Sequence, residues 1–267
     1  MTGKRDVIKI LCFILFLFLY FCIISTTQSV VAYPPVTPLP DMIEVENTLA
    51  EGLMEIRGHR RHVTPKYANR LVEEVKKVTS KDEYSWMSPE LLLGVAINES
   101  DLRPNLIVGY DCGITQNRVT IFTKSRKNRT VLCRKLATST KRSFIYAAKE
   151  LTEIKDRYCV RQWKRMEKAR ARCKEGDLPC AVADRTELAF TRCALNSYNQ
   201  GPRFFREENC EEGERRCIVR ARYWQRVLCF ATGVRLGRTT QRNCRAASSI
   251  EWIAKAYGIS VEEVVTQ

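Results

Sequence analysis

SPELLLGVAINES, from Ser88 to Ser100, predicts a buried helix with a carboxylic acid near its end. Ser88 is a favourable N-cap, Pro89 suits the first helical turn, and Glu90 complements the positive end of the helix dipole. The apolar run at 91–97 supplies a surface that must be buried. The segment therefore predicts a core helix.

Glu99 lies on the packed face of this predicted helix. Leu91 or Leu92, then Val95 and Glu99, recur at intervals of about four residues, which is the spacing of one helical face. A carboxyl group on a packed face is expensive to ionise, so it tends to stay protonated and can act as a general acid near neutral pH. Glu99 is therefore a candidate catalytic acid. Periodicity alone also fits the alternative, an ordinary surface glutamate at a helix end.

The surrounding chain has helical patterns as well. Thr64 followed by Pro65 predicts a helix start, and Leu71, Val75 and Val78 then repeat at helical spacing. A short amphipathic helix is expected over 41–56. The fold class predicted from these patterns is mainly α.

Residues 1–32 have the three parts of a secretory signal. A basic start precedes an unbroken apolar run of 15 residues at 10–24, and small residues stand at the usual cleavage positions, 30–32. The run is shorter than the roughly 20 residues that a spanning helix needs. A cleaved signal is favoured and an uncleaved N-terminal anchor is the alternative. Either way the rest is predicted to be exported, to the periplasm or cell envelope, as an anchored or a secreted protein.

The cysteines agree with export. Ten of the twelve lie between Cys112 and Cys244, and an even number at this density in an exported protein predicts disulfides. Sequence leaves their pairing open. Metal binding is the weaker alternative, because no tight CxxC pairs occur and both histidines, His59 and His62, precede the cysteine region. No metal and no cofactor are expected.

The chain is strongly basic, with a formal net charge of +15. Such a surface is drawn to polyanions, and for an exported protein of bacterial character these are the cell wall and the membrane surface. Nucleic acid fits the charge but not the compartment, so it is not an expected partner. A solvated basic surface without a specific partner remains an open alternative.

The exported part is expected to have three regions. Residues 33–63 form a proline-rich tether with a short helix. Residues 64–235 form the globular domain, with a basic insertion at about 155–180. Residues 236–267 form a tail in which one helix ends at Gly258 and a second begins with a capping box of Ser260 and Glu263. This helix pair resembles that of a LysM glycan-binding module, although a helix-turn-helix fragment fits equally well.

Four polar motifs follow one another in the globular domain: Glu99-Ser100, GITQ at 113–116, SYNQG at 197–201, and Tyr223 with Val227. In this order, over roughly 71–230, they resemble the lytic transglycosylases, lysozyme-like enzymes related to the goose-type lysozymes. Their counterparts there are Glu-Ser, Gly-Leu-Met-Gln, Ala-Tyr-Asn-x-Gly and a closing Tyr-Val segment. The resemblance implies a lysozyme-like transglycosylase (SLT) domain, here stapled by disulfides.

The resemblance also implies a reaction on peptidoglycan. Glu99 would protonate the oxygen of the β-1,4 bond between MurNAc and GlcNAc, and would then take the proton of the C6 hydroxyl, which closes a 1,6-anhydroMurNAc ring without water. The supporting residues would order the acid or line the sugar groove: Ser100, Gly113, Gln116, Tyr198, Asn199, Gly201 and Tyr223. Asp101 and Asp111 are expected to be structural.

Departures from the family pattern keep two other functions open. Thr115 replaces the usual methionine, Ser197 replaces alanine, and Cys112 beside the groove is expected in a disulfide. A hydrolytic lysozyme (muramidase) would need a water-activating group that the sequence does not identify, and a catalytically inactive protein would only bind peptidoglycan. The expected partners are glycan strands, together with the membrane if the N-terminal segment is retained; the oligomeric state is left open.

Overall fold

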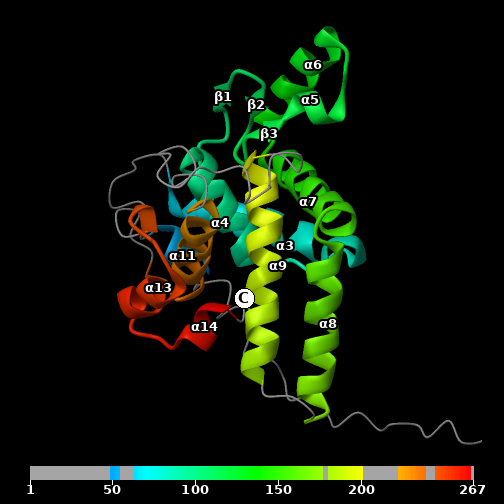
Figure 1. Ribbon diagram of the computed structural model, residues 1–267. Coiled ribbons are helices and arrows are strands. Elements are labelled where there is room, and N and C mark those ends of the chain that lie inside the picture. The colour runs from blue at the N-terminus through cyan, green and yellow to red at the C-terminus, as the bar shows by residue number, and fades with distance from the viewer. Residues whose placement is uncertain (1–48, 55–62, 177–179, 201–221, 239–243, 266–267) are drawn as a thin grey trace, which may run out of the picture. The chain divides into compact units, whose positions relative to one another are not determined.

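The computed structural model describes residues 49–54, 63–176, 180–200, 222–238 and 244–265. This part of the chain is mainly helical, which confirms the predicted fold class (Figure 1). Its elements are α3 (Pro65–Thr79), η2 (Asp82–Tyr84), α4 (Pro89–Ser100), β1 (Ile107–Val108), β2 (Asp111–Cys112), β3 (Asn117–Arg118), α5 (Val119–Phe122), α6 (Arg126–Ala137), α7 (Thr140–Arg157), α8 (Val160–Lys174), α9 (Cys180–Gln200), α11 (Tyr223–Arg235), α13 (Ile250–Tyr257) and α14 (Val261–Val265).

The predicted helix starts are confirmed. The Ser88 hydroxyl accepts a hydrogen bond from the Leu91 amide at 3.1 Å, and α4 begins at Pro89. Thr64 caps α3 in the same way. Each cap satisfies one of the amide groups that a helix N-terminus leaves without a partner.

Helix α4 is the centre of the hydrophobic core. Residues 92–97 are all buried, so the helix is enclosed on nearly every side. Its main neighbour is α11, and the two backbones meet at Gly94, where an added Cβ atom would lie 2.7 Å from the Val227 carbonyl oxygen. Glycine is therefore required there by the close approach of α11.

The basic segment at 155–180 lies largely within a helical hairpin. Helix α8 runs along α9 (Figure 1). The Cys159–Cys193 disulfide joins the start of α8 to α9. On the inner side, the Trp163 ring packs edge to face on Phe190, with the ring centres 4.9 Å apart. The segment thus combines a charged outer surface with an aromatic contact to the core.

A small antiparallel sheet, in the order β1-β2-β3, stands between α4 and α6. Val108 pairs with Asp111, and Cys112 pairs with Asn117. The Cys112–Cys133 disulfide attaches this sheet to α6. The sheet and α6 are therefore linked covalently beside the end of α4.

The two predicted helices of the C-terminal tail are present. Ser249 caps α13, which ends at Gly258 in the left-handed conformation, and Ser260 and Glu263 exchange the two hydrogen bonds of a capping box. Both helices pack against α11, and their apolar side chains belong to the same core as α4. The tail is thus part of this core.

Three disulfides join described cysteines: Cys112–Cys133, Cys159–Cys193 and Cys229–Cys244. Cys173 is disulfide-bonded as well. The predicted disulfide stapling is therefore confirmed, and it is consistent with an exported protein that folds in an oxidising compartment.

The predicted signal (1–32), most of the tether (33–63) and Gly201 lie outside the described residues. Residues 49–54 are helical, within the short helix expected over 41–56. Across the described ranges, no helix is long and apolar enough to cross a membrane.

Gly94→Ala should destabilise the protein by about 1–3 kcal/mol, because the new methyl group would force α4 and α11 apart. Chemical unfolding of the oxidised protein measures this change. Gly109→Ala is the matched control: its Cβ atom would meet no other atom within 4 Å, so only its positive φ opposes the substitution. Equal losses in the two variants would contradict the close packing at Gly94.

Candidate active site

A cleft of about 320 Å³ lies at the C-terminal end of α4. Carboxyl, amide and hydroxyl groups share its walls with aliphatic side chains, so it suits a ligand that has both polar and apolar surfaces. The lining residues are Glu99, Leu106, Val108, Asp111, Gln116, Arg118, Ile121, Glu150, Tyr198 and Asn199.

Glu99 is half-buried in this cleft. The Tyr223 hydroxyl, at the start of α11, donates a hydrogen bond to Glu99 Oε1 at 2.5 Å. Burial raises the pKa of Glu99 to about 7; the hydrogen bond from Tyr223 opposes this rise and the negative charge of Asp111 adds to it. Near neutral pH the group is therefore divided between its acid and base forms, which suits a residue that first gives and then takes a proton.

Ser100 is buried behind the cleft wall. Its hydroxyl donates to the Ile114 carbonyl oxygen at 2.6 Å and lies 3.1 Å from the Ala96 carbonyl oxygen. The next residues, Asp101 and Leu102, both have positive φ, an uncommon conformation for non-glycine residues. Ser100 thus fastens the end of α4 to the segment 113–116 and supports Glu99 without touching the cleft.

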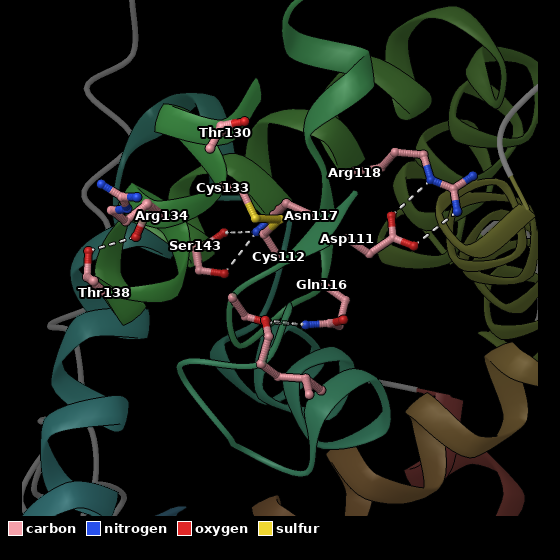
Figure 2. The surroundings of a disulfide bond; sticks show 12 residues. Asp111, Cys112, Gln116, Asn117, Arg118, Thr130, Cys133, Arg134, Thr138 and Ser143 are labelled. Atoms are coloured by element: carbon pink, nitrogen blue, oxygen red, sulfur yellow. Dashed lines mark hydrogen bonds and ion pairs between the residues drawn. A yellow bond between two sulfur atoms is a disulfide. The ribbon is translucent and has the colours of Figure 1, made fainter. Parts of the chain in front are cut away.

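Gly113 is also buried in support. It has φ +83°, and a Cβ atom there would lie 2.8 Å from the Leu136 carbonyl oxygen, so glycine is required both for its conformation and for close packing. The neighbouring Asn117 and Thr115 side chains hydrogen-bond to the Ser143 side chain. Figure 2 shows Asn117 and Ser143 beside the Cys112–Cys133 disulfide. This polar network holds the segment 113–116 on α7.

Gln116 faces the cleft from this segment. Its side-chain amide donates to the Leu106 carbonyl oxygen at 3.0 Å and to the Gly113 carbonyl oxygen at 2.7 Å. Both bonds hold the amide group in place. Its φ is positive, at +48°, and strained residues of this kind gather at functional sites.

Tyr198 and Asn199 form a wall at the end of α9. The Tyr198 hydroxyl donates to the Thr115 carbonyl oxygen at 2.8 Å, so α9 is tied to the segment 113–116. Burial raises the pKa of Tyr198 well above its ordinary value, so its hydroxyl stays protonated. Asn199 is exposed and free to meet a ligand.

The cleft therefore brings together Glu99, Gln116, Tyr198 and Asn199, while Tyr223 contacts Glu99 directly. Ser100 and Gly113 lie behind these residues.

Two further features of the cleft were not predicted. The first is an ion pair: Arg118 on β3 donates two hydrogen bonds to the Asp111 carboxylate on β2, at 2.9 and 3.1 Å (Figure 2). The expected structural role of Asp111 agrees with this pairing. Asp101 ends α4 and lies 3.5 Å from Arg245.

The second is Glu150 on α7, which is only 6% exposed and lines the cleft. Burial raises its pKa to about 8, although the charge of Arg118 opposes the rise. Because the Arg118 guanidinium is bound to Asp111, Glu150 has no salt bridge among the described residues. A buried carboxyl group without a salt bridge keeps its proton, so at neutral pH Glu150 can donate a hydrogen bond but is a poor base.

Helical periodicity could have identified Glu150. Ala147, Glu150 and Ile154 recur at three- and four-residue intervals on the buried face of α7, which is the signal that marked Glu99 on α4. No motif drew attention to it.

No protein family, no curated protein and no solved structure matches this chain. A function for this protein is therefore inferred from the cleft and from the sequence motifs. Among the described residues, no group of three or more His, Cys, Asp or Glu is arranged to hold a metal ion.

Tyr223→Phe should raise the pKa of Glu99 above about 7, because the lost hydrogen bond favours the ionised carboxylate. A carbon-13 NMR titration of glutamate carboxyl groups measures this pKa directly. Tyr158→Phe, at an exposed position, is the control and should leave it unchanged. A fall in the Glu99 pKa would refute the assigned role of Tyr223.

Glu150→Gln should stabilise the protein increasingly as the pH rises from 5 to 9. The folded pKa of about 8 lies above the ordinary value of 4.5, so the folded state binds a proton that the unfolded chain releases. Stability from this group is complete below pH 4.5 and is lost as the pH rises toward and through 8. Glutamine, which cannot ionise, removes this loss of stability, which is about 3–5 kcal/mol at about 1.4 kcal/mol per pKa unit.

Unfolding curves at several pH values test the Glu150 prediction. Glu153→Gln is the control, because Glu153 lies on the same helix but is only partly buried and pairs with Arg157 at 2.8 Å. A constant difference between Glu150→Gln and the wild type at every pH would show that Glu150 is ionised in the folded protein throughout.

Proposed function

We propose that this protein is a lytic transglycosylase with a lysozyme-like domain, which cleaves the MurNAc–GlcNAc β-1,4 bond of peptidoglycan and leaves 1,6-anhydroMurNAc ends. The observation that carries the proposal is the state of Glu99: a half-buried carboxyl group in a cleft, with a pKa raised to about 7 and a hydrogen bond from Tyr223. The order of the four motifs supports the same assignment.

In the proposed reaction, the protonated Glu99 gives its proton to the glycosidic oxygen as the bond from this oxygen to C1 of MurNAc breaks. The Glu99 carboxylate then takes the proton of the C6 hydroxyl, whose oxygen forms the new bond to C1. Glu99 thus regains the proton that it gave, and no water is consumed. Gln116, Tyr198 and Asn199 line the cleft and would contact the sugar.

The other carboxyl groups of the cleft favour this route over hydrolysis. Most glycosidases need a second ionised carboxylate as nucleophile or base. Asp111 is engaged by Arg118, and Glu150 holds its proton at neutral pH. Neither is then a free base at neutral pH, so we favour the C6 hydroxyl over an activated water as the nucleophile.

A hydrolytic lysozyme is the second candidate, and Glu150 is the residue that favours it. Above pH 8 the Glu150 carboxyl group would be ionised and could activate a water. Because hydrolysis also needs protonated Glu99 as its acid, its rate should be highest between about pH 7 and 8 and should fall on either side. The proposed setting for either enzyme is the periplasm or cell envelope.

Digestion of purified peptidoglycan by the oxidised protein tests the proposal. The wild type is expected to release anhydro-muropeptides, and Glu99→Gln to lower the rate by at least about 10²–10⁴-fold, because the general acid is lost. The rate should also fall as the pH rises through about 7, since Glu99 must be protonated to start the reaction.

Mass spectrometry of the products separates the candidates. Products heavier by one water would indicate a lysozyme, and their loss in Glu150→Gln would identify Glu150 as the base. Binding without any cleavage would indicate the catalytically inactive protein.

A further inference from the structure

Positive charge is concentrated in one part of the chain, next to the cleft. Between Cys112 and Lys149 the sequence contains ten Lys and Arg and no Asp or Glu, so this stretch supplies +10 of the formal +15. Within it, β3, α5 and α6 at 117–137 follow the cleft segment 113–116. We call residues 117–137 the basic lobe.

The cations on α6 face solvent without acidic neighbours. Arg126, Lys127, Arg134 and Lys135 are all exposed, and none has an ion pair among the described residues. Like charges gathered on one helix repel one another and strengthen the positive potential around it. A surface of this kind is suited to an anionic ligand.

The basic lobe adjoins the cleft. Arg118 and Ile121 belong to the lobe and also line the cleft. The Cys112–Cys133 disulfide fixes α6 to the strand that carries Asp111, and Figure 2 shows Arg134 of α6 and the Asp111–Arg118 pair on either side of it. A polymer bound in the cleft would therefore have its substituents within the positive potential of α6.

A second depression, of about 290 Å³, lies between the β1–β2 hairpin and α6. Arg129 and Arg134 line it together with Tyr110, and the Arg129 guanidinium lies 5.5 Å from the centre of the Tyr110 ring. Arginines of the lobe and the aromatic ring of the adjacent hairpin thus continue beyond the cleft.

We propose that the basic lobe docks the carboxylates of the peptide stems on the glycan strand held in the cleft. This inference rests on the proposed function, because the stems hang from the MurNAc residues that the cleft would bind. It deepens that function by defining the substrate as glycan that carries peptide stems, in preference to stem-free glycan, on which an amidase leaves only the short lactyl carboxylate.

An anionic membrane is the rival ligand, because Ile107, Val108 and Tyr110 are exposed at the hairpin beside the lobe. Val108 and Ile121, however, line the cleft itself. A hairpin inserted in lipid would bring the membrane onto the cleft, so we assign these apolar side chains to the sugar rings.

Two full-length variants with equal loss of charge test the docking surface. The lobe variant combines Arg126→Gln, Lys127→Gln, Arg134→Gln and Lys135→Gln. The control combines Arg161→Gln, Lys164→Gln, Arg165→Gln and Lys168→Gln, four exposed positions on α8. Both carry Glu99→Gln for the binding assays, so that the substrate stays intact.

Binding is measured to sacculi freed of other anionic polymers, to the same sacculi after an amidase has removed the stems, and to vesicles with and without anionic lipid. The lobe variant should bind stem-bearing sacculi about tenfold more weakly than its parent, since each exposed charge pair contributes roughly a factor of two. The α8 control should retain the parent's affinity, and removal of the stems should abolish the difference between the two variants.

The other outcomes are equally informative. Equal losses in both variants, or a difference that persists without stems, would overturn the docking of stem carboxylates. Loss of binding by the lobe variant to anionic vesicles alone would assign the lobe to membranes.

The same panel keeps this inference distinct from the proposed function. Stem-dependent binding through the lobe in a protein that releases no anhydro-muropeptides would refute the transglycosylase and retain the docking surface. Unchanged binding of the lobe variant to stem-bearing sacculi, together with release of anhydro-muropeptides when Glu99 is present, would refute the docking surface and retain the transglycosylase.

Discussion

The packing of α4 against α11 is the contact on which the cleft depends. It brings together Glu99 and Tyr223, which are 124 residues apart in the chain, at a hydrogen-bond distance of 2.5 Å. The absence of a side chain at Gly94 lets the two backbones approach, and the apolar face of α4 drives their association. The same burial raises the pKa of Glu99, so the force that builds the core also sets the proton affinity of the candidate acid.

Three carboxyl groups share the cleft, and their surroundings give them different states. Asp111 is held by two hydrogen bonds from Arg118, Glu150 is buried without a salt bridge among the described residues, and Glu99 lies between these extremes with a hydrogen bond from Tyr223. Because their hydrogen-bond partners and their burial differ, the three acids are suited to different roles. Of the two buried acids, Glu99 is the one that Tyr223 contacts and the one with the lower pKa, about 7 against about 8 for Glu150, so it is the better candidate for an acid-then-base reaction.

Local patterns predicted much of this arrangement, and long-range contacts account for the rest. Capping residues such as Ser88 and Ser260 marked helix starts correctly, because a cap depends only on its neighbours. The Asp111–Arg118 pair depends on the register of strands two residues long, which no sequence pattern specifies. Ser100, expected near the acid, turns away from the cleft because its hydroxyl binds a carbonyl oxygen fourteen residues ahead. Glu150 showed the helical periodicity of a buried acid but belonged to no motif.

The Cys112–Cys133 disulfide gives the cleft a dependence on compartment. Cys112 directly precedes the segment that carries Gln116, and Cys133 lies on α6, so one covalent bond holds a cleft wall to a neighbouring helix. This bond forms where thiols are oxidised and not in a reducing cytoplasm. A chain held in a reducing compartment would lack the restraint, and its groove would be looser. Oxidation of these two cysteines is therefore the step that completes the cleft wall.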